Sequence, residues 1–144
     1  MSGLSDLRLS FEPHNESLKQ FIVNGVDNHN IARTGHSAYY PVQYFLRDAD
    51  DEVLGGLLGQ IWGEWLHVNF LWVAEPARGR GQARALMLAA EAYAAKRRCR
   101  GAFLETFSFQ ARPFYEKLGY EVFGELKDYP PGQTQYFMKK NFPS

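Results

Sequence analysis

Three apolar segments in succession, separated only by short polar turns, constrain the fold of this chain more than any other feature. They span residues 42–47, 53–62 and 66–73. The first alternates apolar and polar residues, as a half-exposed strand does. Connections as short as Asp48–Asp51 and Gly63–Glu64 join antiparallel neighbours, because a parallel return needs a long crossover. The sequence therefore predicts an antiparallel meander in the middle of the chain.

Helices and further strands are expected on both sides of this meander. In chain order they are a strand at 7–11, a helix capped by Asn15, a loop or irregular second helix at 29–39, a helix at 81–98, a strand at 102–107, a helix at 109–118 ended by Gly119, and strands at 120–126 and 134–140. This order predicts an α/β (α+β) fold with a mixed, mostly antiparallel sheet of about six to seven strands, flanked by about four helices. Residues 1–144 contain no repeat, low-complexity tract or linker, so we expect a single domain.

The charge balance argues against a nucleic-acid partner. Sixteen basic residues meet sixteen acidic ones, for a formal net charge of zero, and duplex binding needs a strongly positive surface. A local basic run, Lys96–Arg100, suits the solvated end of a helix, where the helix dipole favours cations. We expect a binding partner other than nucleic acid.

Cysteine content and the N-terminal residues indicate a compartment. Cys99 is the single cysteine, so no intrachain disulfide can form, which suits a reducing cytosol. Its expected role is structural, because no chemistry-bearing motif surrounds it. Residues 1–6 do not resemble a signal peptide, and no apolar run approaches the ~20 residues of a membrane helix. We expect a cytoplasmic protein with no membrane partner.

The Gly-rich segment Arg78–Ala83 follows the third strand of the meander and opens a helix. A helix start carries unpaired N–H groups and a positive dipole, and glycines let that backbone approach a phosphate. The phosphate loop of nucleotide hydrolases is excluded, because Gln82 and Ala83 stand where it needs Lys and Ser or Thr. The dinucleotide pattern fails at Arg84, which stands where Gly or Ala is required.

The segment does fit the pattern R/Q-x-x-G-x-G/A, through Arg78, Gly81 and Ala83. A second stretch, residues 111–120, fits A-x-x-F-Y-x-x-x-G-[FY]. In these two motifs, their separation and the strand order, the chain resembles the GNAT superfamily of N-acetyltransferases, and small bacterial members of unassigned substrate in particular. The resemblance covers nearly the whole chain and is best over residues 53–123.

The resemblance implies a GNAT-like sheet and acetyl-CoA as co-substrate, with no metal. In that family the strand before the Gly-rich loop parts from its neighbour and its backbone binds the pantetheine arm and polarises the thioester. The cofactor-binding residues it implies here are Leu71, Trp72, Val73, Arg78, Gly79, Arg80, Gly81, Gln82, Ala83 and Ser108. Ser108 departs from the family, where many members carry Asn, and as a short hydroxyl residue it also suits a helix N-cap.

Catalytic roles follow from the same resemblance. Tyr115 is the expected general acid that protonates the departing thiolate, as the tyrosine of the second motif does in the family. It also lies on the apolar face of a short helix and could be a core residue. Four residues are open as the general base: Glu105, His67, Glu64 and Glu75. His67 has the best unperturbed pKa for this task and is expected to share a strand face with Asn69, Leu71 and Val73. A water chain remains a further alternative.

The expected acceptor is a small-molecule amine, and a protein amine is left open. The family places its acceptor pocket near residues 29–40 and 127–133, where an aromatic lining would suit an amine or its cation. The candidate lining residues are Tyr39, Tyr40, Trp62, Trp65 and Tyr129. The predicted reaction is direct acetyl transfer in a ternary complex. Two alternatives stay open: a non-catalytic acyl-CoA sensor or interaction module, and a nucleic-acid protein using Lys96–Arg100. A homodimer is left open too, as common for soluble oligomers.

Overall fold

The structure, a computed structural model, describes residues 4–144. The chain divides into two compact units, residues 1–37 and residues 38–144. Each unit is described by itself.

The first unit is dominated by one long helix. A 3-10 helix, η1 (Leu4–Asp6), precedes α1 (Glu16–Thr34). Asn15 caps α1 as predicted, because its side-chain oxygen accepts a hydrogen bond from the backbone N–H of Leu18 at 3.1 Å. Gly35 ends the helix in the left-handed region, with φ 76°, a conformation that favours glycine.

Two predictions for this unit are wrong. Residues 7–11 do not form a strand; alternation produces a strand only where a neighbour supplies ladder hydrogen bonds, and no described strand pairs with them. Residues 29–34 are the last two turns of α1 rather than a loop or second helix. Helix α1 ends at Thr34, where Gly35 forms its C-cap. The described residues therefore contain three α-helices rather than about four.

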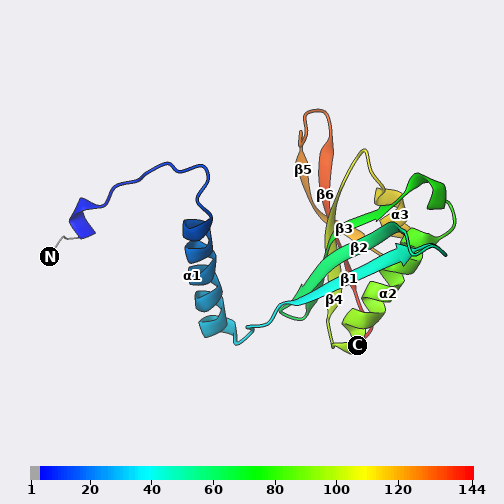
Figure 1. Cartoon of the computed structure of the whole chain (residues 1–144), viewed down its shortest axis with the longest axis horizontal. Helices are drawn as coiled ribbons and strands as arrows, with labels where there is room; N and C mark the ends of the chain where they lie inside the picture. The colour runs from blue at the N-terminus through cyan, green and yellow to red at the C-terminus, as the bar shows by residue number, and fades with distance from the viewer. Residues whose placement is uncertain (1–3) are drawn as a thin grey trace. The chain divides into compact units, whose positions relative to one another are not determined.

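The second unit contains a six-stranded mixed sheet in the order β1-β2-β3-β4-β6-β5, with α2 alongside it (Figure 1). All neighbours are antiparallel except β3 and β4, which are parallel. The meander is confirmed. The elements, in chain order, are β1 (Tyr40–Arg47), β2 (Val53–Trp62), β3 (Trp65–Val73), η2 (Glu75–Ala77), α2 (Gln82–Lys96), β4 (Gly101–Phe107), α3 (Arg112–Lys117), β5 (Glu121–Lys127) and β6 (Thr134–Asn141).

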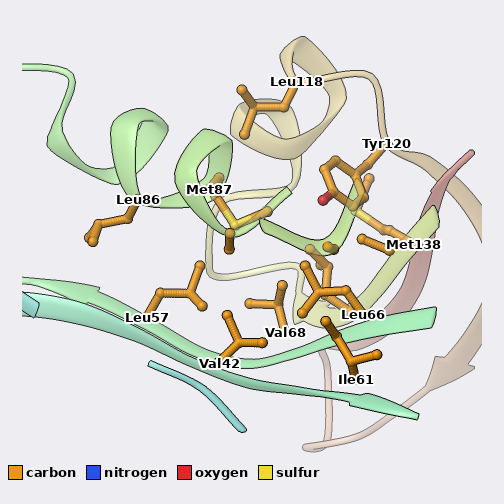
Figure 2. Packing of buried hydrophobic residues seen from close by; sticks show 14 of the residues in the cluster. Val42, Leu57, Ile61, Leu66, Val68, Leu86, Met87, Leu118, Tyr120 and Met138 are labelled. Carbon is orange, nitrogen blue, oxygen red and sulfur yellow. The ribbon is translucent and has the colours of Figure 1, made fainter. Parts of the chain in front are cut away.

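The core lies between the sheet and its two helices. Met87 and Ala90 of α2 are fully buried against Leu57, Leu66 and other strand residues. Figure 2 shows Leu118 and Tyr120 on the same side of the sheet as Met87, so α2 and the α3 segment cover one face. Each fully buried large apolar side chain, such as Leu57, Leu66 or Met87, stabilises the fold by roughly 1.5–3 kcal/mol relative to exposure.

The short helix α3 is shorter than predicted. It spans Arg112–Lys117 rather than 109–118, with Pro113 in its first turn and Leu118 as its C-cap. Gly119 follows with φ 99°, which confirms that a glycine ends this helix. Proline suits the first turn, where its missing N–H has no helical partner.

Candidate active site

β3 and β4 part from each other halfway along their lengths. Their parallel pairing begins at Trp65 and ends where Val68 lies opposite Leu104. Both strands continue beyond that point, β3 to Val73 and β4 to Phe107. The last part of β3 therefore has no β4 partner in the described chain, and the unpaired backbone groups of such an edge can hydrogen-bond an extended ligand.

A β-bulge in β3 coincides with this separation. In the β2–β3 ladder, Gly59 pairs with Val68 and Leu58 pairs with Phe70, so Asn69 is an extra residue in β3. A bulge bends its strand and increases the local twist. The bulge at Asn69 therefore turns the end of β3 away from the direction it shared with β4.

The bulge also reverses the faces of β3. Val68 is buried in the core, and beyond the bulge Leu71 and Val73 pack in that same core. His67 lies on the opposite face and lines a pocket there. The expectation that His67, Asn69, Leu71 and Val73 share one face is wrong, because strict alternation fails where one residue is inserted.

A second pocket, of about 340 Å³, lies where the Gly-rich loop enters α2. Gly79 and Gly81 have φ values of 77° and 74°, which favour glycine. A Cβ added at either would meet no atom within 4 Å, so this surface is open. Gly81 is the N-cap of α2 and offers no side-chain hydrogen bond, which leaves the first-turn N–H groups for a ligand. The lining residues are Val73, Ala77, Arg78, Gly79, Gly81, Gln82, Ala83, Arg84 and Phe114.

The charge in this second pocket is positive. Arg78 and Arg84 line it, and no acidic residue does. Arg80, predicted for the same site, is not among the lining residues. The Nε of Arg78 donates to the backbone oxygen of Val73 at 2.8 Å and so ties the loop to the end of β3. Open glycines, free helix N–H groups and arginines form a surface suited to a phosphate or pyrophosphate.

His67 and Glu105 meet across the two parting strands. The Nε2 of His67 lies 2.9 Å from one carboxylate oxygen of Glu105 and 3.1 Å from the other. His67 lies one residue before Val68, the last paired residue of β3. Glu105 lies one residue after Leu104, the last paired residue of β4. Both side chains are less than a third exposed. The pair therefore lies at the point where the strands separate.

The contacts of His67 define which nitrogen can act as a base. A carboxylate only accepts hydrogen bonds, so Nε2 carries the proton that Glu105 accepts. The other nitrogen, Nδ1, keeps its lone pair when the ring is neutral and lies 3.4 Å from the side-chain nitrogen of Asn69. A base oriented by a third group in this way is a common catalytic arrangement.

The other two base candidates lie elsewhere in the fold. Glu64, in the β2–β3 turn, accepts from the Nε of Arg100 at 2.7 Å. Glu75 lies in η2, beyond the far end of β3. The structure brings two of the four candidates, His67 and Glu105, together.

Tyr115 lies half-buried on α3. Its ring makes edge contacts with Phe114, at 5.1 Å between centroids, and with Tyr120, at 6.1 Å. Burial raises the pKa of Tyr115 above its ordinary value, which keeps the phenol protonated. None of the described residues makes a hydrogen bond to its hydroxyl group. Such a phenol can donate a proton but is a poor base.

Ser108 does not cap α3, because the N-cap residue is Ala111 and it makes no side-chain cap bond. Its hydroxyl donates to the side-chain oxygen of Gln133 at 2.6 Å and accepts from the backbone N–H of Thr134 at 2.9 Å. Ser108 therefore joins the end of β4 to the start of β6. The N-cap interpretation is wrong, because the chain makes an extra turn before α3 begins.

A buried charged network was not anticipated from the sequence. Glu91 of α2 is 8% exposed, and it accepts hydrogen bonds from the hydroxyl of Tyr120 at 2.8 Å and from Lys140 Nζ at 2.7 Å. Burial, together with Glu91, raises the pKa of Tyr120 well above its ordinary value. The sequence does contain a sign of this network. Glu91 follows Met87 by one helical turn, so the helical spacing puts a charged residue on the core face of α2.

The aromatic candidates separate into two groups. Tyr39, Trp62 and Trp65 line a pocket of about 310 Å³ together with Gln60, Gly63, His67 and Phe103. Tyr40 lies instead beneath the guanidinium of Arg97, 3.7 Å from its ring centroid, and Tyr129 packs near Phe107 at 5.8 Å. The aromatic pocket ends at His67 and therefore adjoins the His67–Glu105 pair.

The remaining sequence features are structural in the described part of the chain. Cys99 is buried, and burial raises the pKa of its thiol. In the basic run, Arg97 stacks on Tyr40. Arg100 forms an ion pair with Glu64. Among residues 4–144, no helix is long and apolar enough to cross a membrane. Those residues also include no group of three His, Cys, Asp or Glu side chains arranged to hold a metal ion.

Comparison with known proteins identifies the family. The sequence profile of the Acetyltransferase (GNAT) family matches residues 6–120. The chain is 37% identical over 114 residues to an acetyltransferase of Agrobacterium fabrum, covering 79% of this chain and 83% of that protein. It is 43% identical over 90 residues to the blasticidin-S acetyltransferase of Streptomyces morookaense, covering 62% of this chain and 66% of the relative. The chain belongs to the GNAT acetyltransferase family.

The fold agrees with this assignment. The crystal structure of an acetyltransferase from Bacillus cereus ATCC 14579 resembles the chain with a TM-score of 0.84 and 30% sequence identity. The match covers 93% of this chain and 98% of that one. The expected GNAT-like mixed sheet is confirmed.

Proposed function

We propose that the chain transfers an acetyl group from acetyl-CoA to a primary amine of a small molecule, directly within a ternary complex. The observation that carries the proposal is the gap between β3 and β4. It has the His67–Glu105 pair at its apex, and β3 leads from there to the Gly-rich pocket. A single extended acetyl-CoA molecule would then span the distance from the Gly-rich pocket to His67.

The donor end of the proposal rests on Arg78–Ala83. Residues Gly79, Gly81, Gln82 and Ala83 would present backbone N–H groups to the pyrophosphate, and Arg78 and Arg84 line the same pocket. Arg80 and Ser108 remain proposed contacts for outer parts of the acetyl-CoA molecule. The backbone of Leu71, Trp72 and Val73 would pair with the pantetheine arm. Acetyl-CoA supplies the acyl group as a thioester when it is bound.

The chemical step needs a general base, a general acid and a hydrogen-bond donor to the thioester carbonyl oxygen. In the proposal His67 Nδ1 removes a proton from the ammonium, since an alkylammonium has a pKa near ~10 and is charged at neutral pH. Glu105 accepts a hydrogen bond from Nε2 of His67 and so orients the imidazole ring. A backbone N–H of residues 71–73 stabilises the charge that develops on the carbonyl oxygen, by roughly 2.7–4 kcal/mol. As the new N–C bond forms and the C–S bond breaks, Tyr115 gives its proton to the sulfur. The nitrogen then loses its second proton, which restores the phenol of Tyr115, and His67 releases the first proton to solvent.

One relative supports the class of acceptor that we propose. The Streptomyces morookaense relative is named for acetylation of blasticidin S, a small molecule. A small-molecule amine is therefore the acceptor that we propose, and the aromatic pocket beside His67 is the place where it would bind. We also propose that residues 1–144 act as one acetyltransferase domain, because the family match at residues 6–120 spans parts of both units.

The test combines turnover with binding. The purified chain is incubated with acetyl-CoA and a panel of small amines, and free thiol is followed against a reaction without amine. We expect amine-dependent thiol release with the acetylated amine as product. Calorimetry with acetyl-CoA provides a second readout. Tight binding without turnover over the panel would overturn the proposal in favour of a non-catalytic acyl-CoA module.

A further inference from the structure

The pocket that ends at His67 is walled almost entirely by aromatic rings. Tyr39 stacks on Trp62 with ring centroids 5.9 Å apart and planes at 22°. Trp65 meets Phe103 edge to face at 6.4 Å. Phe103 in turn stacks on His67 at 4.2 Å with planes at 12°. The two groups of rings meet where Trp62 lies opposite Trp65 in the β2–β3 ladder. We call these five rings the aromatic strip.

The charges around the aromatic strip favour a positive guest. No Lys or Arg lines the pocket, and the carboxylate of Glu105 lies 2.9 Å from His67 at one end. In the turn between Trp62 and Trp65, Glu64 is paired with Arg100 at 2.7 Å. Ring faces carry negative potential and attract cations, most strongly for tryptophan.

The same molecule already shows a planar cation on such a ring. The guanidinium of Arg97 lies 3.7 Å from the centroid of Tyr40, the neighbour of Tyr39 in the chain, and that of Arg112 lies 4.6 Å from the centroid of Tyr136. Guanidinium is flat and weakly hydrated, so it stacks on aromatic faces more readily than an ammonium group. The rings around this pocket are therefore partners that a flat cation can use.

The size of the pocket limits its occupant. A volume of about 310 Å³ lies at the lower end of the range for ligand pockets. It is large enough for a single flat group with a short chain. Along the sheet, His67 lies opposite Gln60, and Trp62 lies opposite Trp65. These two positions are two residues apart, which is roughly 7 Å.

We propose that the aromatic strip binds a planar organic cation carried by the acceptor, at a short distance from the amine that is acetylated. This inference rests on the proposed function and narrows it to amines that carry a guanidinium or similar flat cation. Trp62 and Tyr39 determine specificity in this proposal. They hold the part of the acceptor that does not react, while its amine lies at His67.

Three acceptors with the same butyl chain and the same primary amine test the proposal. Agmatine carries a guanidinium at its other end, putrescine an ammonium, and 4-amino-1-butanol a neutral hydroxyl. We expect kcat/KM for agmatine to exceed that for 4-amino-1-butanol by about tenfold and that for putrescine by several-fold, through KM. Equal kcat/KM values for the three amines would overturn the inference and leave the proposed function standing.

Variants assign the preference to the aromatic strip. W62L and Y39L are expected to raise KM for agmatine about tenfold with little change in kcat, and W62F to retain most of the preference. F123L is the matched control, because Phe123 is exposed on β5 and packs on Phe137. Unchanged agmatine KM in both W62L and Y39L, with folding verified by circular dichroism, would also overturn the inference.

Binding without turnover separates this inference from the proposed function. Ligand-observed NMR of agmatine is recorded with the full chain in the absence of acetyl-CoA. We expect binding to the wild type and its loss in W62L and Y39L. If no amine is acetylated but agmatine binds in this way, the aromatic strip is confirmed and the proposed reaction fails. If amines are acetylated but agmatine binds no better than 4-amino-1-butanol, the inference fails alone.

Discussion

His67 and Glu105 touch across the only parallel strand pair of the described sheet, with Nε2 and Oε2 2.9 Å apart. The contact joins residues 38 positions apart in sequence. It forms because α2 carries the chain from the end of β3 back to the start of β4, so that the two strands run side by side. The strands separate immediately beyond this contact. The position of the pair at this separation is the reason that we propose His67 as the base and Glu105 as the residue that orients it.

The first prediction concerns that base. H67A should lower kcat by roughly 10²-fold at pH 7, within the range of general base catalysis, and leave acetyl-CoA affinity unchanged. The deficit should shrink as pH rises towards about 10, because the free amine fraction grows roughly tenfold per unit and needs no base. Steady-state rates from pH 7 to 9.5 check this. A deficit that is constant across this range would contradict the role.

The second prediction concerns the residue that orients the imidazole. E105Q should lower kcat by roughly tenfold or more, because a neutral amide holds the Nε2 proton less strongly than a carboxylate. E125Q is the matched control, since Glu125 is exposed on β5. Rates and calorimetric acetyl-CoA affinity are measured for both variants. Equal rates for E105Q and the wild type would exclude Glu105 from the mechanism.

The third prediction concerns Tyr115. Y115F should reduce kcat by roughly 10²–10⁴-fold while acetyl-CoA binding and the free energy of unfolding stay near wild-type values. The hydroxyl has no hydrogen-bond partner among the described residues, so its removal leaves no buried group unpaired. Y44F, on β1 and packed against the core, is the control for loss of a tyrosine hydroxyl. Full activity of Y115F would remove the acid from the mechanism.

Local signals were enough to predict much of the fold. The meander followed from short turns between apolar segments, and the start of α1 followed from Asn15, whose cap is observed. Helical spacing also predicts an apolar face of α2, formed by Leu86, Met87, Ala90, Tyr93 and Ala94. All of them are buried except Tyr93, which is partly buried against the same core. These features depend on neighbours within a few residues.

The parts that could not be predicted depend on distant partners. The bulge at Asn69 is defined by the register with β2, and nothing in the local sequence marks it. Without it, alternation puts Leu71 on the wrong face. The contact of His67 with Glu105 depends on the length of the α2 crossover. The alternation at residues 7–11 suggested a strand that no described strand pairs with.

The fourth prediction concerns the Gly-rich loop. Gly81 has φ 74°, and G81A should destabilise the chain by roughly 1–2 kcal/mol, the strain of a left-handed L-residue. The new Cβ would meet no protein atom within 4 Å, so it would project into open space where the pyrophosphate should bind. We expect acetyl-CoA affinity to fall at least about tenfold.

A control separates strain from binding in this case. Gly35 ends α1 with φ 76°, and a Cβ there is equally uncrowded. G35A should therefore cost similar stability but leave acetyl-CoA affinity unchanged. Urea unfolding and calorimetry are compared for both variants. Equal losses of affinity in G35A and G81A would show that strain alone weakens binding and that the loop has no special role.

The fifth prediction concerns the buried network of Glu91, Tyr120 and Lys140. K140M leaves the Glu91 carboxylate buried with one neutral partner. Removing one member of a buried ion pair costs roughly 3–5 kcal/mol, and we expect less than this because the Lys140 side chain is 24% exposed. Y120F should cost roughly 1.5–3 kcal/mol, the value of a hydrogen bond to a charged group. Urea unfolding gives both free energies.

The triple variant E91L/Y120F/K140M tests whether the network stabilises the fold. Replacing all three groups with apolar side chains removes the desolvation cost together with the attraction and leaves no Tyr120 hydroxyl without its acceptor. Its stability should therefore recover towards wild type relative to K140M. The pKa of Tyr120 is raised in the fold. Its contribution to stability is therefore full at neutral pH and is lost as pH rises above the ordinary tyrosine pKa of ~10. Y120F should accordingly lose less stability than the wild type between pH 9 and 11. If the triple variant is as unstable as K140M alone, or if Y120F and the wild type lose stability in parallel over that range, the three side chains are not coupled as their contacts indicate.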